Sequence, residues 1–185
     1  MQPGTIQSIL DEAHDILSRA VGPNNRREYM RANNIHGDIN WHFTLTAPDI
    51  IRNRIPSNVI GCTGRAKLFC HLAKQHGVAC NVVIIANIRD LQREHDAARG
   101  TTPDNTHIII NGHQIISTDT PDGPRMFDPG ARQLNFLTEQ PHIGGIVDIG
   151  GSQDFIIRAL VPGDKFMSLS SYWELDNMYR NGDAY

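Results

Sequence analysis

The sequence predicts an α+β fold. Helical patterns fill its first part and strand patterns its second part, an order typical of helices combined with an antiparallel sheet. Between them, residues 58–86 form a loop, a helix and a buried strand in the prediction. With 185 residues and 39% hydrophobic content the chain can bury one sizeable core, so we expect a single domain over residues 1–185.

We divide this domain into three parts. Residues 1–57 form a helical N-terminal part, and residues 58–165 form the core that holds the candidate site. Residues 166–185 form a C-terminal helix and tail. The capping box from Ser171 to Glu174 begins that helix, and Gly182 ends it.

Helical spacing and capping residues predict the helices of the N-terminal part. Apolar residues three and four apart indicate a helix over residues 6–20, and a short helix is expected around residues 27–32. Thr46 is a typical N-cap, and Asp49 is favourable in the first turn, so a third helix is expected over residues 47–54.

The central helix begins at Cys62. Its apolar stripe is formed by Ala66, Phe69, Cys70 and Ala73. Gly77 fits the left-handed position that ends many helices. Unpaired backbone N–H groups and the positive end of the helix dipole favour a thiolate at a helix N-terminus, which makes Cys62 a candidate nucleophile.

Short apolar runs predict the strands, which cover residues 81–87, 106–110, 113–118, 125–128 and 154–160. Asn111-Gly112 between two of these runs indicates a two-residue hairpin turn. A second turn is expected over residues 120–124. The charged residues 88–104 are expected to form a surface loop or flap.

A nucleophilic thiol needs a base, and that base needs an orienting acid. His113 begins one expected strand and Asp128 ends the next, so an antiparallel pairing brings them to the same level. There Asp128 could accept the imidazole N–H and stabilise the imidazolium. His107 with Asp119 is a comparable pair, and strand geometry alone leaves both pairs open.

Residues 61–79, Gly-Cys-Thr-Gly-Arg-Ala-Lys-Leu-Phe-Cys-His-Leu-Ala-Lys-Gln-His-Gly-Val-Ala, resemble the nucleophile segment of the transglutaminase-like superfamily. Gly112-His113 and Asp128-Pro129 resemble that family's second and third motifs. The resemblance implies a papain-like core, in which the nucleophile helix packs on an antiparallel β-sheet, and a triad of Cys62, His113 and Asp128. The sequence departs from the family pattern where aromatic residues are usual, at Gln114 and at Arg125-Met126.

The resemblance implies a cysteine-dependent amide hydrolase or acyltransferase of protease, deamidase or transglutaminase type. Cys62 would carry a thioester intermediate, with His113 as base and Asp128 as orienting acid. A protein or peptide amide is the expected substrate. Two alternatives stay open: a non-catalytic binding module with the same fold, and an acyltransferase that uses a thioester donor such as coenzyme A.

An oxyanion intermediate needs hydrogen-bond donors. The backbone N–H of Cys62 is one expected donor, because a helix start presents free N–H groups. The upstream candidates for a second donor, or for the cleft wall, are the side chains of Trp41, His42 and Asn58.

Composition argues against several function classes. The formal net charge of −3 gives no electrostatic reason to expect nucleic acid or a membrane surface as partner. No apolar run approaches the about 18 residues of a membrane span. Cysteine and histidine spacings do not match a zinc site, so we expect no metal and no cofactor. The N-terminus lacks a signal-peptide pattern, and three cysteines do not suggest a disulfide framework, so a cytoplasmic location is expected, although signal-independent export fits the same sequence.

Overall fold

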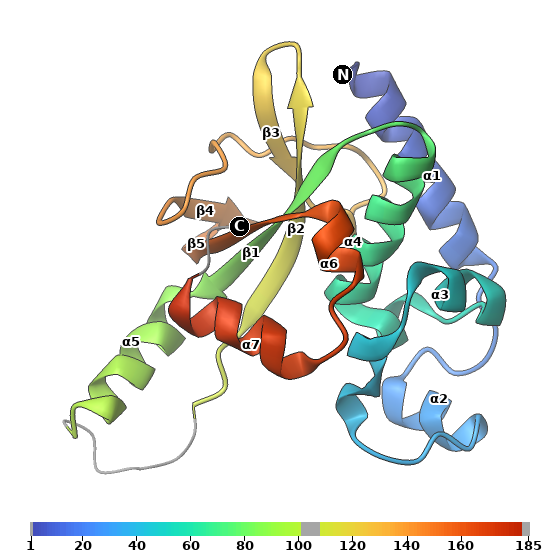
Figure 1. Ribbon diagram of the computed structural model, residues 1–185, viewed down its shortest axis with the longest axis horizontal. Coiled ribbons are helices and arrows are strands. Elements are labelled where there is room, and N and C mark those ends of the chain that lie inside the picture. Colours follow the sequence, from blue (N-terminus) through green and yellow to red (C-terminus); the bar gives the residue numbers. More distant parts are fainter. Residues whose placement is uncertain (1, 101–107, 183–185) are drawn as a thin grey trace.

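A twisted antiparallel sheet with helices packed against it forms the core of the protein (Figure 1). The computed structural model describes residues 2–100 and 108–182. The helices are α1 (Pro3–Ser18), α2 (Arg26–Ala32), the 3-10 helix η1 (Ile39–Thr44), α3 (Ala47–Asn53), α4 (Ser57–Gln75), α5 (Ile88–Ala98), α6 (Gly163–Met167) and α7 (Tyr172–Asn181). The strands are β1 (Cys80–Asn87), β2 (Gly112–Thr120), β3 (Gly123–Phe127), β4 (Ile146–Ile149) and β5 (Ser152–Pro162). The predicted α+β class is confirmed.

The strands are arranged in the order β3-β2-β1-β5-β4, and each neighbouring pair is antiparallel. Strand β1 lies in the centre, and alternate side chains point to opposite faces. Val82 and Ile84 join the cluster that includes α1 and α4, whereas Val83 and Ile85 join a second cluster with Val147 of β4. Both faces of β1 are therefore covered, which accounts for its continuous apolar run.

Helix α4 packs on the sheet and lies beside α1 (Figure 1). The predicted apolar stripe of α4 is buried, and Gly77 follows the C-cap with φ +69° as expected. The start of α4 differs in one detail from the prediction. Residues 57–60 form a helical turn instead of a loop, and Gly61 then leaves helical geometry with φ 63° and ψ −163°. The regular helix begins at Cys62, as predicted.

Residues 88–98 form the helix α5, so the prediction of a loop or flap over 88–104 is wrong for them. The side chain of Asn87 caps the helix by accepting the N–H groups of Arg89 and Asp90, at 3.0 and 3.3 Å. Good helix-forming residues then extend the helix despite its high charge. Residues 101–104 of the expected flap lie outside the described residues.

The predicted hairpin at Asn111-Gly112 is also wrong. Neither residue has the positive φ that a type I′ turn requires, and residues 108–110 are not in a strand. Strand β2 begins at Gly112 and pairs with β1 instead. The glycine is required for packing, because a Cβ at Gly112 would lie 2.1 Å from Cε1 of Tyr179. Residues 106 and 107 lie outside the described part of the chain.

The remaining predicted elements are present with small shifts in their ends. They are the helices near residues 6–20, 27–32, 47–54 and 171–182, and the strands near 81–87, 113–118, 125–128 and 154–160. Thr46 and Asp49 form the predicted cap as a full capping box. Helices η1 and α6 and strand β4 were not predicted from the sequence. Among the described residues, no helix is long and apolar enough to cross a membrane.

Lys67 is a buried cation that ties α4 to two distant segments. Its side chain is 1% exposed, and Nζ donates hydrogen bonds to the carbonyls of Phe43, Leu45 and Leu169 at 2.8, 3.2 and 2.6 Å. Burial lowers the pKa of Lys67 to about 8, although the charge of Glu174 partly opposes the shift. One buried ammonium group therefore joins three backbone carbonyls of two distant segments.

Replacing Lys67 with methionine should destabilise the fold by about 1–3 kcal/mol, because buried carbonyls lose a charged donor. Lys74→Met is the matched control on the same helix. It removes an exposed ion pair with Asp164, 2.8 Å long, and exposed pairs contribute about 0.2–1 kcal/mol. Urea denaturation of both variants measures the difference, and an equal loss in the two would contradict the structural role of Lys67.

Candidate active site

Cys62 is a half-buried free cysteine at the point where α4 resumes after Gly61. Two arginines hold the turn before it. Arg26 donates from Nε to the carbonyl of Val59 at 2.9 Å, and Arg65 donates from Nε to the carbonyl of Gly61 at 3.2 Å. A Cβ at Gly61 would lie 3.2 Å from a guanidinium nitrogen of Arg26, so the turn is both conformationally and sterically suited to glycine.

His113 and Asp128 are in direct contact. His113 lies at the second position of β2, and Asp128 directly follows β3. Nε2 of the ring is 2.7 Å from Oδ2 of the carboxylate, and the other carboxylate oxygen accepts the N–H of Gly130 at 2.7 Å. The predicted contact is present, and the antiparallel pairing of β2 with β3, which extends to Ile116 and Phe127, brings the two residues near each other. In this register Asp128 falls level with residue 115 and not with His113 as predicted.

Cys62 interacts with the same imidazole ring. The thiol and the His113 ring share a hydrogen bond, and the sulfur also accepts the backbone N–H of Gln114. Because Nε2 of His113 faces Asp128, Nδ1 is the ring nitrogen left for the sulfur. The ring of His113 therefore contacts both Asp128 and Cys62.

These contacts favour a charged thiolate. Burial raises the pKa of the Cys62 thiol, but the hydrogen bond and the charge of His113 lower it. The N–H of Gln114 and the positive charge of Arg65 lower it further, so the pKa lies below the ordinary thiol value. An ion pair of thiolate and imidazolium is the state that these partners stabilise.

The same balance applies to the other two groups. Burial alone lowers the pKa of the His113 ring, but the hydrogen bonds and charges of Asp128 and Cys62 raise it from 6.5 to about 9. Burial raises the pKa of Asp128, yet the hydrogen bond and charge of His113 lower it below its ordinary value. Asp128 is therefore an anion beside an imidazolium.

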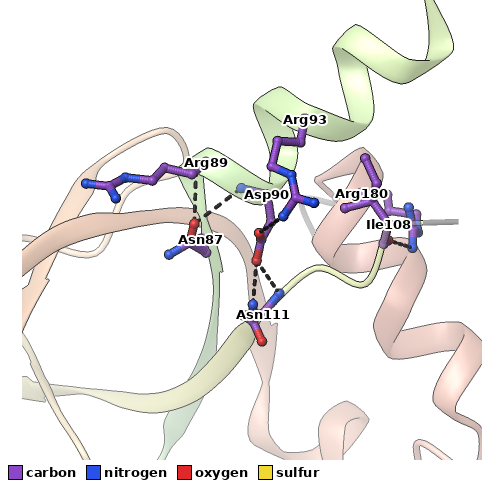
Figure 2. Close-up of polar contacts among 7 residues, drawn as sticks. All are labelled: Asn87, Arg89, Asp90, Arg93, Ile108, Asn111 and Arg180. Carbon is purple, nitrogen blue, oxygen red and sulfur yellow. Dashed lines mark hydrogen bonds and ion pairs between the residues drawn. The ribbon is translucent and has the colours of Figure 1, made fainter. Parts of the chain in front are cut away.

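The start of β2, which carries His113, is anchored to α5 (Figure 2). The carboxylate of Asp90 accepts hydrogen bonds from the backbone N–H of Asn111 at 3.0 Å and from its side-chain amide at 2.6 Å. The carbonyl of Asn111 in turn accepts the N–H of Asn87 at 2.8 Å. Arg180 of α7 bonds to the carbonyl of Ile108 at 3.1 Å, so the approach to β2 is fixed from two helices.

Gln114, which follows the histidine, belongs to a buried polar network. Thr63 of α4 donates to its Oε1 at 2.8 Å, and its amide nitrogen bonds to the Tyr179 hydroxyl of α7. Gln114, the residue after His113, is thus bonded to Thr63, the residue after Cys62, and to α7. This network gives a packing reason for a polar residue where the family resemblance led us to expect an aromatic one.

The three upstream candidates for the oxyanion donor differ in their surroundings. His42 is buried, and its Nδ1 is 3.1 Å from the carbonyl of Ile39. Burial, followed by the charge of Arg26, lowers the pKa of His42 to about 4, so its ring is neutral at neutral pH. Asn58 is exposed, whereas Nε1 of Trp41 is buried without a hydrogen-bond partner among the described residues. A role of these side chains as oxyanion donors stays a prediction.

Of the alternative pair, His107 and Asp119, the structure describes Asp119 alone. His107 lies outside the described residues. Asp119 is exposed on β2, six residues beyond His113, which corresponds to about 20 Å along a strand. Asp119 is therefore remote from the ring that contacts Cys62.

Two residues of this site were missed in the sequence analysis. Arg65 lies three residues after Cys62 on the same helix, a spacing that places both on one face and could have identified it. Arg26 comes from α2, and no local pattern links it to Cys62. Burial lowers the pKa of Arg26 while the charge of Cys62 raises it, as expected for a cation beside a thiolate.

Comparison of the chain with protein-family models, with curated proteins and with solved structures found no match. Within residues 2–100 and 108–182, the His, Cys, Asp and Glu side chains form no group of three or more that could hold a metal ion.

Gly61→Ala should destabilise the fold by about 1–3 kcal/mol, because its backbone conformation is essentially restricted to glycine. The change should also move the His113 ring resonances in an NMR spectrum. Gly77→Ala is the matched control: Gly77 also has positive φ, but at the opposite end of α4, so it should cost about 1–2 kcal/mol and leave those resonances in place. Unmoved resonances in Gly61→Ala would refute the link between this turn and the site.

An NMR titration should give the His113 ring a pKa near 9, and Asp128→Asn should lower it. Since the folded-state pKa is above the ordinary 6.5, the stabilisation from this pair is fully present below pH 6.5 and is lost as pH rises through 9. The stability difference between the parent and Asp128→Asn should therefore shrink over that range. A ring that titrates near 6.5 in both proteins would disprove the assigned charge state.

Proposed function

We propose that this protein is a cysteine-dependent amide hydrolase or acyltransferase, with Cys62 as nucleophile, His113 as base and Asp128 as orienting acid. The observation that carries the proposal is the contact of one imidazole ring with both the Asp128 carboxylate and the Cys62 thiol. Covalent catalysis by a thiol requires a base within hydrogen-bond reach of the nucleophile and a third group that orients the base.

The reaction begins with attack of the Cys62 thiolate on an amide carbonyl carbon. The carbonyl oxygen gains the negative charge of a tetrahedral intermediate, next to the N-terminal N–H groups of the helix that begins at Cys62. When the intermediate collapses, the C–N bond breaks and the His113 imidazolium donates its proton to the leaving amine. A thioester on Cys62 remains.

The second half of the reaction resolves the thioester. Neutral His113 removes a proton from water or from an acceptor amine, which attacks the thioester carbonyl and releases the thiolate. Water gives net hydrolysis, as in a protease or deamidase, and an amine gives transfer of the acyl group. Asp128 stabilises the imidazolium whenever the ring is protonated.

Further features agree with a transglutaminase-like, papain-like core. Helix α4 carries the nucleophile at its start and packs on an antiparallel sheet, whose strand β2 carries the base. Asp128 follows the adjacent strand β3. The proposal includes a protein or peptide amide as substrate and a cytoplasmic location, for which a reducing compartment suits the three free cysteines.

The proposal is tested with a library of glutamine-containing and other peptide amides. The parent should release ammonia or a peptide amine, and hydroxylamine should divert the acyl group to a hydroxamate. Cys62→Ala should abolish product formation, and His113→Gln should lower kcat/KM by about 10²–10⁴-fold.

His71→Gln is the matched control, because His71 is a half-buried histidine on α4 outside the triad contacts. It should retain parent activity. Hydroxamate formation that survives Cys62→Ala would overturn the assigned nucleophile. A parent chain that binds peptide amides without turnover would support the binding-module alternative.

A further inference from the structure

A second pair of thiols lies elsewhere on the same helix. Cys70, two turns beyond Cys62 on α4, faces Cys80, the first residue of β1. Their sulfur atoms are 3.4 Å apart and share a hydrogen bond. The proposed amide chemistry uses neither of them.

The surroundings of the pair leave room for a small reagent. A cavity of about 200 Å³ is lined by both cysteines and by Lys74, Gly163 and Asp164. One water molecule occupies about 30 Å³ of liquid, so the cavity can admit a hydroperoxide. Cys80 is half-buried whereas Cys70 is 2% exposed, so Cys80 is the sulfur that a reagent reaches first.

Gly163 lies against both sulfur atoms. Gly163 begins α6, and a Cβ there would lie 3.0 Å from the sulfur of Cys80 and 3.2 Å from that of Cys70. Glycine therefore allows both sulfurs to occupy this corner. The shared hydrogen bond lowers the pKa of Cys80 and raises that of Cys70, which agrees with a nucleophilic Cys80 and a protonated Cys70.

We propose that Cys70 and Cys80 form a redox site that hydroperoxides oxidise to a disulfide, separate from Cys62. The Cys80 thiolate attacks one peroxide oxygen, the O–O bond breaks, and Cys80 becomes a sulfenic acid. The departing alkoxide or hydroxide takes a proton and leaves as alcohol or water. The Cys70 sulfur then attacks the Cys80 sulfur, the S–O bond breaks, and the hydroxyl leaves with the Cys70 proton as water.

The reaction is balanced in atoms and electrons. Two thiols lose two protons and two electrons, and one hydroperoxide takes them up to give one alcohol, or water, and one further water. The product links the helix of Cys62 to the central strand of the sheet. Since a disulfide restricts the unfolded chain, the oxidised protein should melt at a higher temperature.

Digestion with trypsin separates the three cysteines for mass analysis, because each lies in a different peptide. The peptides are residues 55–65, 68–74 and 75–89. The folded parent is treated with two equivalents of hydrogen peroxide, because the Cys62 thiolate can itself consume one. The remaining thiols are then alkylated, and the digest is analysed by mass spectrometry. The expected result is that peptides 68–74 and 75–89 are joined, with the loss of two hydrogen atoms. The chain denatured in urea, treated identically, should give a mixture of pairings.

Two variants complete the design. In Cys70→Ala the linked peptide should be absent, and a sulfenic acid trap such as dimedone should label peptide 75–89. In Cys80→Ala the linked peptide should also be absent, and peptide 68–74 should stay unlabelled by the trap. The proposal is overturned if peptides 68–74 and 75–89 of the folded parent remain separate while peroxide is consumed, or if folded and denatured chains give the same mixture.

Discussion

The backbone leaves helical geometry at Gly61, one residue before Cys62, and the geometry of the candidate site depends on that turn. The turn separates a single helical turn from the regular part of α4, so free N–H groups and the thiol occupy the same end of the helix. Arg26 and Arg65 bind the carbonyls on either side of the turn and place positive charge near the sulfur. The backbone conformation of the turn and the positive charge near the sulfur therefore depend on the same few contacts.

Burial disfavours the charged forms of Cys62, His113 and Asp128. Hydrogen bonds and charges among the three side chains offset this effect. The ring of His113 is the shared partner, because it forms hydrogen bonds with both Asp128 and Cys62. Its position depends on β2, which Asp90 and Tyr179 hold from two different helices. The helices α5 and α7 thus support the site without contributing a reacting group.

Local patterns were sufficient where one short segment determines the structure. The helix start at Cys62, the stop at Gly77 and the approach of His113 to Asp128 follow from caps and from antiparallel pairing. The sequence prediction was wrong where a contact with a distant residue determines the local structure. Asn111-Gly112 resembles a hairpin turn, but Asp90 and Tyr179 give it another role. The missed strand β4 is four residues long, too short for a clear periodic signal.

The central claim is that Cys62 is a thiolate paired with the His113 imidazolium. The most direct test is the pH dependence of iodoacetamide alkylation at Cys62, resolved by peptide mass in the parent and in His113→Gln. We predict rapid alkylation of the parent below about pH 7, where an ordinary cysteine of pKa about 8.5 is protonated, and loss of this reactivity in His113→Gln. A Cys62 that reacts as an ordinary thiol in both proteins would contradict the claim.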